Sequence, residues 1–342
     1  RNQLTVLKEF IQHAKESTLI KYMILLLAIP NMILPLLDYQ FNVLVDNYFA
    51  SEALTLQFFG IFRGVSNALM FALLMGSSRL ITRWGVPTSL LFHPINYCIA
   101  FAGIFLRFDI FAAVYARVTT EMLKTVLNNP ARAVLYNFFP EKHRSMIRLV
   151  LRGSVVRAAD FAGSGFLTLI RGVIKPRMLS LVALPFALIW VVTSFRLKKA
   201  YPGILIQSIK ENQMDWKQME DDQLQLIAKD KLITQTFQQG LESKDGKVAL
   251  LCGEFLYRTQ PDQWVEHLLS VIAQKEPGVQ KQLLDFLSPE NIGSHRSRMY
   301  ELARSVPLEA LPYWLEALTR IDPSESGPFM EEFLSHPDDR VK

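Results

Sequence analysis

The sequence predicts an all-α membrane protein in two parts, a bundle of six transmembrane helices followed by a stack of short paired helices. Half of the 342 residues are hydrophobic and only 20% are charged. Residues 1–200 carry 22 Lys and Arg against 9 Asp and Glu, whereas residues 201–342 carry 15 against 23. Long charge-free runs occur in the basic part, and short amphipathic periods in the acidic part. The chain therefore divides near residue 200.

Six apolar segments in the basic part have lengths suited to membrane-spanning helices, which need about 20 residues to cross a hydrocarbon core of ~30 Å. Two of them, 108–134 and 148–170, contain four or more charged residues each. We still predict spans there, because six spans account for the charges of the loops and four do not. The predicted spans are 20–45, 55–79, 84–106, 108–134, 148–170 and 178–195.

The charges of the connecting loops orient these spans. Several Lys and Arg residues precede the first span, follow the last, and occupy the loops 79–88 and 137–148. The loop 46–53 has two acids and no cation, while the loop 171–177, with three cations, departs from the alternation. Because cytoplasmic loops carry an excess of Lys and Arg, we expect both ends of the chain and the loops 79–88 and 137–148 in the cytoplasm.

Charged and polar residues inside the predicted spans recur at helical spacing, which places them in stripes along single helix faces. A charge at the bilayer centre costs about 2.5–3.5 kcal/mol on insertion scales. We therefore expect these side chains to face other helices or a water-filled cavity. The candidate substrate-binding residues are Asp38, Arg63, Asn67, Arg117, Glu121, Lys124, Arg152, Arg157 and Asp160.

Two interpretations of these stripes remain open. One is a polar cavity with net positive walls, suited to an anionic solute. The other is a set of internal ion pairs, Arg117 with Glu121 and Arg157 with Asp160, that only fixes the packing of helices. Arg63 favours the cavity, because its own span contains no acid to pair with it. His93, directly before Pro94, is expected to mark a kink and not a ligand.

One loop motif resembles the major facilitator superfamily, whose cytoplasmic-loop motif is Gly-x-Leu-x-Asp-Arg-x-Gly. The stretch between the second and third predicted spans reads Ser78-Arg79-Leu80-Ile81-Thr82-Arg83-Trp84-Gly85. Leu80, Arg83 and Gly85 match, while Ser78 and Thr82 replace the Gly and the Asp. The resemblance implies half of a facilitator fold, in which two six-helix halves enclose a site near the bilayer midplane.

Two further stretches resemble the nucleotide (ATP/ADP) exchange transporters. Their Asp-Pro-Thr-Lys segment, with a following Tyr and trailing lysines, is similar to Asn129-Pro130-Ala131-Arg132, Tyr136, Arg144 and Arg148. Asp38-Tyr39-Gln40-Phe41 is also similar to that family. The resemblance covers about residues 20–200 and implies the C-terminal half of such a transporter, with Asn and Arg in place of the family's Asp and Lys.

The acidic part has a repeat. Expected helix starts fall at Asp245, Glu276, Pro307 and Pro337, and each unit holds two amphipathic helices. This period resembles HEAT repeats, which stack into a solenoid; a compact helical domain with accidental spacing is the alternative. We expect a six-span domain over 1–200, an amphipathic helical linker over 201–239 that begins where Tyr201-Pro202-Gly203 ends the last span, and HEAT-like repeats over 240–342.

No arrangement of residues is placed for catalysis or for binding a metal, so we expect neither an enzyme nor a cofactor. The two cysteines, Cys98 and Cys252, lie in different parts and predict no disulfide framework. The start at Arg1 and the helix-like end at 339–342 lead us to expect a piece of a longer protein.

The resemblances imply an integral protein of a bacterial inner membrane that moves an anionic or nucleotide-like solute and carries a cytoplasmic protein-binding domain. The implied partners are the lipid bilayer, a second six-helix half and a protein at the repeats, with no nucleic acid. The alternative is a non-transporting scaffold that anchors a HEAT-like adaptor in a larger complex.

Overall fold

The computed structural model describes residues 3–139, 141–210 and 231–334, and all regular structure within these ranges is helical. This confirms the all-α class. The chain divides into two compact units, and the main boundary along the sequence falls between Ile204 and Leu205. We call them the first unit and the second unit. Of the predicted linker 201–239, residues 211–230 lie outside the described ranges.

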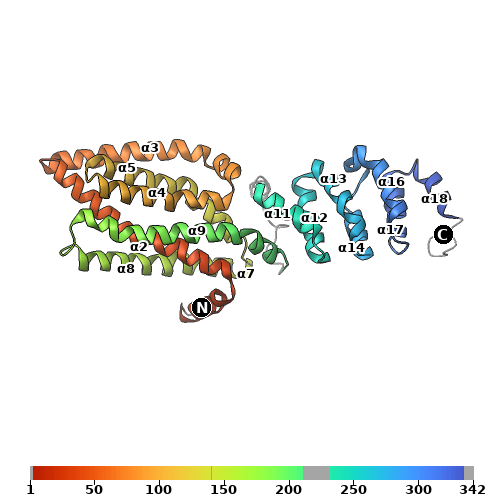
Figure 1. Cartoon of the computed structure of the whole chain (residues 1–342), viewed down its shortest axis with the longest axis horizontal. Coiled ribbons are helices and arrows are strands. Elements are labelled where there is room, and N and C mark those ends of the chain that lie inside the picture. The colour runs from red at the N-terminus through yellow and green to blue at the C-terminus, as the bar shows by residue number, and fades with distance from the viewer. Residues whose placement is uncertain (1–2, 140, 211–230, 335–342) are drawn as a thin grey trace. The chain divides into compact units, whose positions relative to one another are not determined.

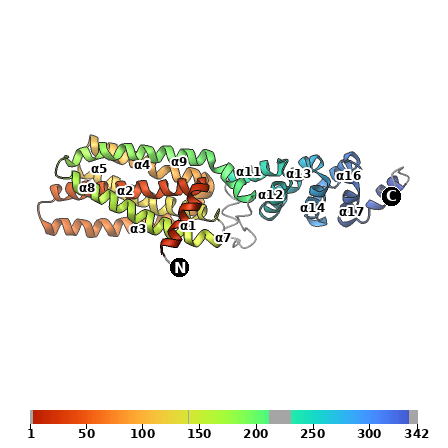
Figure 2. The ribbon, with the colours of Figure 1, turned by 90° about the horizontal axis from the view of Figure 1, so that it is seen from below.

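Within its described residues, the first unit contains six long helical rods. These rods run alongside one another (Figure 1 and Figure 2). Two rods are composite: a π-helical segment, Lys124–Asn128, joins α5 to α6, and another, Val150–Val155, joins α7 to α8. A short helix, α1, precedes the rods. The helices are α1 Gln3–Glu16, α2 Thr18–Tyr48, α3 Glu52–Trp84, α4 Val86–Leu106, α5 Ile110–Leu123, α6 Asn129–Tyr136, α7 Glu141–Leu149, α8 Val156–Ile170 and α9 Leu179–Lys210.

Four helices within the described residues are long and apolar enough to cross a membrane. They are Thr18–Tyr48, Glu52–Ser77, Val86–Leu106 and Pro176–Ser208. These coincide with four of the six predicted spans. The two charge-bearing segments also form helical rods, over 110–136 and 141–170, but are not among the four. The first unit is therefore consistent with an integral membrane protein.

The predicted loop 79–88 is wrong. α3 continues through Trp84, and α4 begins at Val86. Gly85 alone separates them; its amide donates to the Ile81 carbonyl at 2.8 Å, which completes the last turn of α3. The reason is its backbone conformation, because a φ of 79° is readily adopted by glycine and lets the chain turn within one residue. The loop 137–148 is likewise shorter than predicted, since α7 begins at Glu141.

The predicted end of the last span at Tyr201-Pro202-Gly203 is also wrong. α9 continues through Pro202 to Lys210. The Tyr201 ring is buried and lies 5.6 Å from the ring of Phe138, between centroids, so tertiary packing holds this stretch in the helix. Such packing offsets the single backbone hydrogen bond that a proline removes.

Small residues and polar side chains hold the rods of the first unit together. α2 packs closely on α8, where Ala159 and Gly163 are buried, and a Cβ on Gly163 would overlap the backbone carbonyl of Met32. Gln40 of α2 donates to the Ser180 hydroxyl of α9 at 2.9 Å. Such small contact residues and interhelical hydrogen bonds are typical of helix packing in membranes.

α3 is the least covered rod of the first unit. It lies beside α4 and the rod 110–136, and most of its large apolar side chains are exposed. Met75, for example, is 78% exposed and Phe71 is 70% exposed. Ile81, close to the turn into α4, is buried. The described helices therefore leave most of the surface of α3 free.

The second unit is a series of short helices in two layers (Figure 1). α12, α14 and α17 stack on one another in chain order, and α13, α16 and α18 pack beside them. The helices are α11 Lys231–Glu242, α12 Gly246–Thr259, α13 Pro261–Val271, α14 Pro277–Leu284, α15 Pro289–Ile292, α16 Arg296–Ser305, α17 Leu311–Ile321 and α18 Ser326–Leu334. The expected start at Pro337 lies outside the described residues.

Candidate functional site

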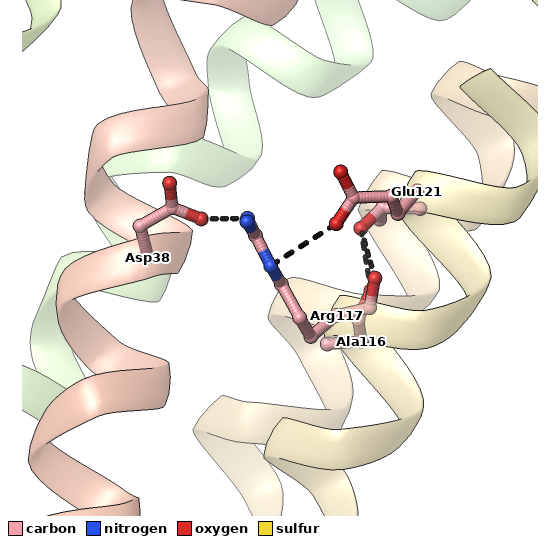
Figure 3. Close-up of polar contacts among 5 residues, drawn as sticks. Asp38, Ala116, Arg117 and Glu121 are labelled. Carbon is pink, nitrogen blue, oxygen red and sulfur yellow. Dashed lines mark hydrogen bonds and ion pairs between the residues drawn. The ribbon is translucent and has the colours of Figure 1, made fainter. Parts of the chain in front are cut away.

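Three charged side chains meet between α2 and α5, and we call them the charge network (Figure 3). Arg117 of α5 donates from Nη1 to Oδ1 of Asp38 on α2, and its Nε lies 3.4 Å from Oε2 of Glu121. The sequence predicts the pair of Arg117 with Glu121, which are one helical turn apart. The contribution of Asp38 comes from a different rod, so only the fold brings it to Arg117. One cation thus holds two carboxylates.

A small recess of about 20 Å³, room for about one water molecule, lies next along the same rods, and we call it the basic recess. Lys124 is one turn beyond Glu121 on its rod and also acts electrostatically on Asp38. Six of the eight lining residues carry a polar or charged group, and none of the eight is acidic. The lining residues are Pro30 and Asn31 with Leu34 from α2, His93 and Tyr97 from α4, and Lys124, Asn128 and Arg132 from the rod 110–136.

His93 is a buried part of the wall of the basic recess, although the sequence predicts for it only a kink beside Pro94. Its Nδ1 lies 2.9 Å from Nδ2 of Asn128. Its ring meets the ring of Trp190 on α9 edge to face, with 4.9 Å between centroids. His93 is 2% exposed, so α4, α9 and the rod 110–136 together enclose a polar ring in the interior of the first unit.

Beyond the recess, two exposed arginines, Arg148 and Arg152, lie against the ring of Tyr136, and a buried one, Arg132, lies one turn before Tyr136 on its rod. We call these four residues the arginine cluster. The guanidinium carbon of Arg148 lies 5.1 Å from the centre of the Tyr136 ring, and that of Arg152 lies 5.6 Å from it. Tyr136 is buried, and Arg132 is 8% exposed. Arg132 lines the basic recess as well, so the recess and the cluster share this residue.

The two π-helical segments fall within these polar regions. Lys124 and Asn128 begin and end the first one, and Arg152 lies in the second. A π segment adds one residue to a turn of the helix, which keeps residues four apart on one face. Asn128, Arg132 and Tyr136 follow Lys124 at intervals of four, so the widened turn keeps this stripe directed at the same side of the rod.

Four of the predicted site residues lie elsewhere. Arg63 and Asn67 are exposed on α3, and Arg157 and Asp160 are exposed on α8. The ion pair predicted between Arg157 and Asp160 does not form in the part of the chain that the structure describes. Of the other five, Asp38, Arg117 and Glu121 form the charge network, Lys124 lines the recess and Arg152 belongs to the arginine cluster.

The stripe of Arg117, Glu121 and Lys124 extends to Asn128, and two further turns along it lie Arg132 and Tyr136. The sequence names Arg132, Tyr136 and Arg148 only through the resemblance to the exchange transporters. Arg148 is not on this stripe, because it reaches Tyr136 from another rod. Sequence periodicity identifies residues that share one helix face, whereas contacts between rods depend on tertiary packing.

The described ranges contain two cysteines and other side chains of the types that bind metals. No group of three or more His, Cys, Asp and Glu side chains there could hold a metal ion. Cys98 and Cys252 are free thiols. Cys252, in the second unit, is fully buried, and burial raises the pKa of its thiol to about 12, so the reactive thiolate is suppressed at neutral pH.

The chain matches no protein-family model, no curated protein and no solved structure. Its class therefore comes from its own architecture. It is an all-helical chain with four helices long and apolar enough to cross a membrane. Between the rods of its first unit lie a charge network, a basic recess and an arginine cluster.

Proposed function

We propose that the first unit is one six-span half of a facilitator-type transporter for an anionic solute. The observation that carries this proposal is the polar region between otherwise apolar rods. Lys124 and Arg132 line the basic recess without an acid in its wall. Charged groups inside a membrane are costly, and where they occur they commonly mark a pathway for a solute or ion.

A second six-helix half is part of the proposal, from the same full-length chain or from another chain. α3 and α8 carry Arg63, Asn67, Arg157 and Asp160 on exposed faces. Such charges are unfavourable against lipid, and a second half that covers these faces would enclose them in an aqueous pathway. The nine candidate residues would then line one cavity. A nucleotide-like solute suits its arginines, because guanidinium groups bind phosphates well.

For the second unit we propose a cytoplasmic solenoid of HEAT-like repeats that binds a protein partner. The support is the stacking of α12, α14 and α17 in chain order with a second layer beside them. In such solenoids each repeat contacts its neighbours and the stacked helices form an extended surface for partners. The bacterial inner membrane is the proposed location, with both ends of the chain in the cytoplasm.

A non-transporting scaffold is the second candidate, and one observation favours it. Arg117 is already neutralised by Asp38 and Glu121. In a scaffold, the charge network would fix α2 against α5 and bind no solute. In that case the first unit is a membrane anchor for the repeats.

Counterflow in membrane vesicles that contain the complete gene product separates the two candidates. Radiolabelled ATP, ADP and orthophosphate are offered outside vesicles loaded with the same unlabelled compound. A transporter accumulates at least one of them, and Lys124→Gln and Arg63→Gln abolish accumulation at equal protein levels. Arg107→Gln is the matched control, because Arg107 is exposed at the end of α4 and pairs only with Asp109 within the described residues. Absence of counterflow for all three compounds would favour the scaffold.

A further inference from the structure

We infer that the arginine cluster, Arg132, Tyr136, Arg148 and Arg152, is a binding site for a phosphate group. The phosphate can belong to a soluble compound or to a lipid headgroup, since both offer the same anionic oxygens. The inference does not depend on transport, because binding at this site can be measured in a protein that moves nothing.

Arg132 is a buried cation whose donors are mostly unused. It is 8% exposed, and its Nη2 donates to Oδ1 of Asn129 at 2.5 Å. A guanidinium has five N–H donors, so most of them remain for another acceptor. No carboxylate pairs with it anywhere in the described ranges. A buried charge is normally paired, because its lost hydration has to be replaced. An anionic ligand would supply the missing partner.

Arg148 and Arg152 are two like charges held close together. They are one helical turn apart on the rod 141–170, and like charges at this spacing repel each other. Both nevertheless converge on the ring of Tyr136, at 5.1 and 5.6 Å from its centre. Arg152 also acts electrostatically on Arg132. Contact with the ring face is a cation–π interaction, which holds the guanidinium groups in place and leaves most of their N–H donors free. Two exposed cations from one rod thus converge on one aromatic ring, and the buried Arg132 lies one turn before that ring on the other rod.

The chemistry of these groups selects the ligand. Three guanidinium groups exclude a metal cation and favour an anion of more than one charge. Each guanidinium can donate two parallel hydrogen bonds to a phosphate or carboxylate. A phosphate offers several oxygens in a tetrahedral arrangement, which allows donors from different directions to bind at once. The neighbouring Arg144 is not available, because it donates to the carbonyls of Asn137 and Phe139.

The test measures binding to the full chain in nanodiscs of phosphatidylcholine. One arm titrates radiolabelled orthophosphate. The other arm replaces part of the lipid by phosphatidic acid, whose headgroup is a phosphate monoester, and measures its enrichment by mass spectrometry of the detergent-extracted protein. Arg148→Gln and Arg152→Gln are the test variants. Lys142→Gln is the matched control, because it removes the same charge from the same rod at an exposed position that makes none of the described contacts with Tyr136.

We expect at least one probe to bind the unaltered chain, and each arginine variant to weaken that binding about tenfold or more. Lys142→Gln should leave it within about twofold, since a distant exposed charge is largely screened. Orthophosphate binding identifies a soluble ligand, and enrichment of phosphatidic acid alone identifies a lipid. Arg148→Lys should retain part of the affinity, which separates loss of charge from loss of fold. The inference fails if neither probe binds, or if both arginine variants bind like Lys142→Gln.

Discussion

Trp314 connects two helices of the second unit through a single hydrogen bond. Its Nε1 donates to Oε1 of Gln280 at 2.7 Å, and Nε2 of Gln280 donates to the Lys275 carbonyl at 2.7 Å. Trp314 and Gln280 are both fully buried. The glutamine therefore joins α17, α14 and the turn before α14. Because water cannot reach this site, each hydrogen bond in it has no replacement.

Trp314→Phe should destabilise the contact between α14 and α17 by about 1–3 kcal/mol, because it leaves Oε1 of Gln280 buried without a donor. Hydrogen–deuterium exchange of the full chain measures this as faster exchange over Pro277–Leu284 and Leu311–Ile321. Trp264→Phe is the matched control. Trp264 is equally buried, but its Nε1 makes no hydrogen bond within the described part of the chain. Equal acceleration by both variants would show that lost volume, and not the hydrogen bond, is responsible.

These residues show what the sequence can specify at the smallest scale. The amphipathic period of the helices places Trp264 and Trp314 at packing positions. The period says nothing about which indole finds an acceptor, because Gln280 reaches Trp314 from the preceding stacked helix. The same holds in the first unit, where helical spacing predicts the pair of Arg117 and Glu121 but not the approach of Asp38.

Gly163 controls the closest approach of two rods. A methyl group at this position would overlap the carbonyl of Met32 on α2, whereas a methyl group at Gly165 would meet no atom within 4 Å. The side of α8 that carries the buried Ala159 and Gly163 is thus a contact surface. Ala158 and Ala162, each one residue earlier, are exposed.

Gly163→Ala should lower the melting temperature of the purified chain, because overpacking of a close contact costs about 1–3 kcal/mol. Gly165→Ala should leave it unchanged or raise it, since alanine is favoured over glycine in a helix by about 1 kcal/mol. Thermal unfolding in detergent, followed by circular dichroism, compares the two. A lower melting temperature for both variants would mean that the effect is not specific to the contact with α2.

Helix positions were largely predictable at the scale of elements, and helix interruptions were not. Long apolar runs and the proline and glycine residues around them place α2, α4 and α9 within a few residues of their observed starts. The π-helical segments have no such signature, because a change from i→i+4 to i→i+5 hydrogen bonding is compatible with the same residues. A turn at Gly85 could be predicted from the sequence, but its length of one residue depends on the φ angle of Gly85.

The orientation of the whole chain in the membrane can be tested with single cysteines. We expect Ser145→Cys to react with a membrane-impermeant maleimide only after cells are opened, and Ala50→Cys to react in intact cells, because cations concentrate in the segment 137–148 and are absent from 46–53. Both residues are exposed, and Ala50 lies in the turn between α2 and α3. Cys98→Ala and Cys252→Ala form the background. Labelling of Ser145→Cys in intact cells would contradict the proposed orientation.

The division of the whole molecule follows from charge. The change from basic to acidic composition near residue 200 lies close to the boundary between Ile204 and Leu205. The helix that crosses this boundary was not foreseen, because the burial of Tyr201 outweighs the local signal of Pro202. The exposed charges of α3 and α8 were also unforeseen, since spacing within a helix cannot tell which neighbour covers a face.

Because Gly85 alone connects α3 to α4, the number of residues between these helices is more constrained than the identity of those residues. α3 and α4 have no loop between them that could absorb an added or deleted residue. Each inserted residue rotates the preceding helix by about 100° around its axis. One insertion between Ile81 and Gly85 would thus turn the face of α3 that carries Arg63 and Asn67 by about 100° relative to α4. The number of residues from Arg63 to Gly85 therefore determines the direction in which the polar face of α3 points relative to α4.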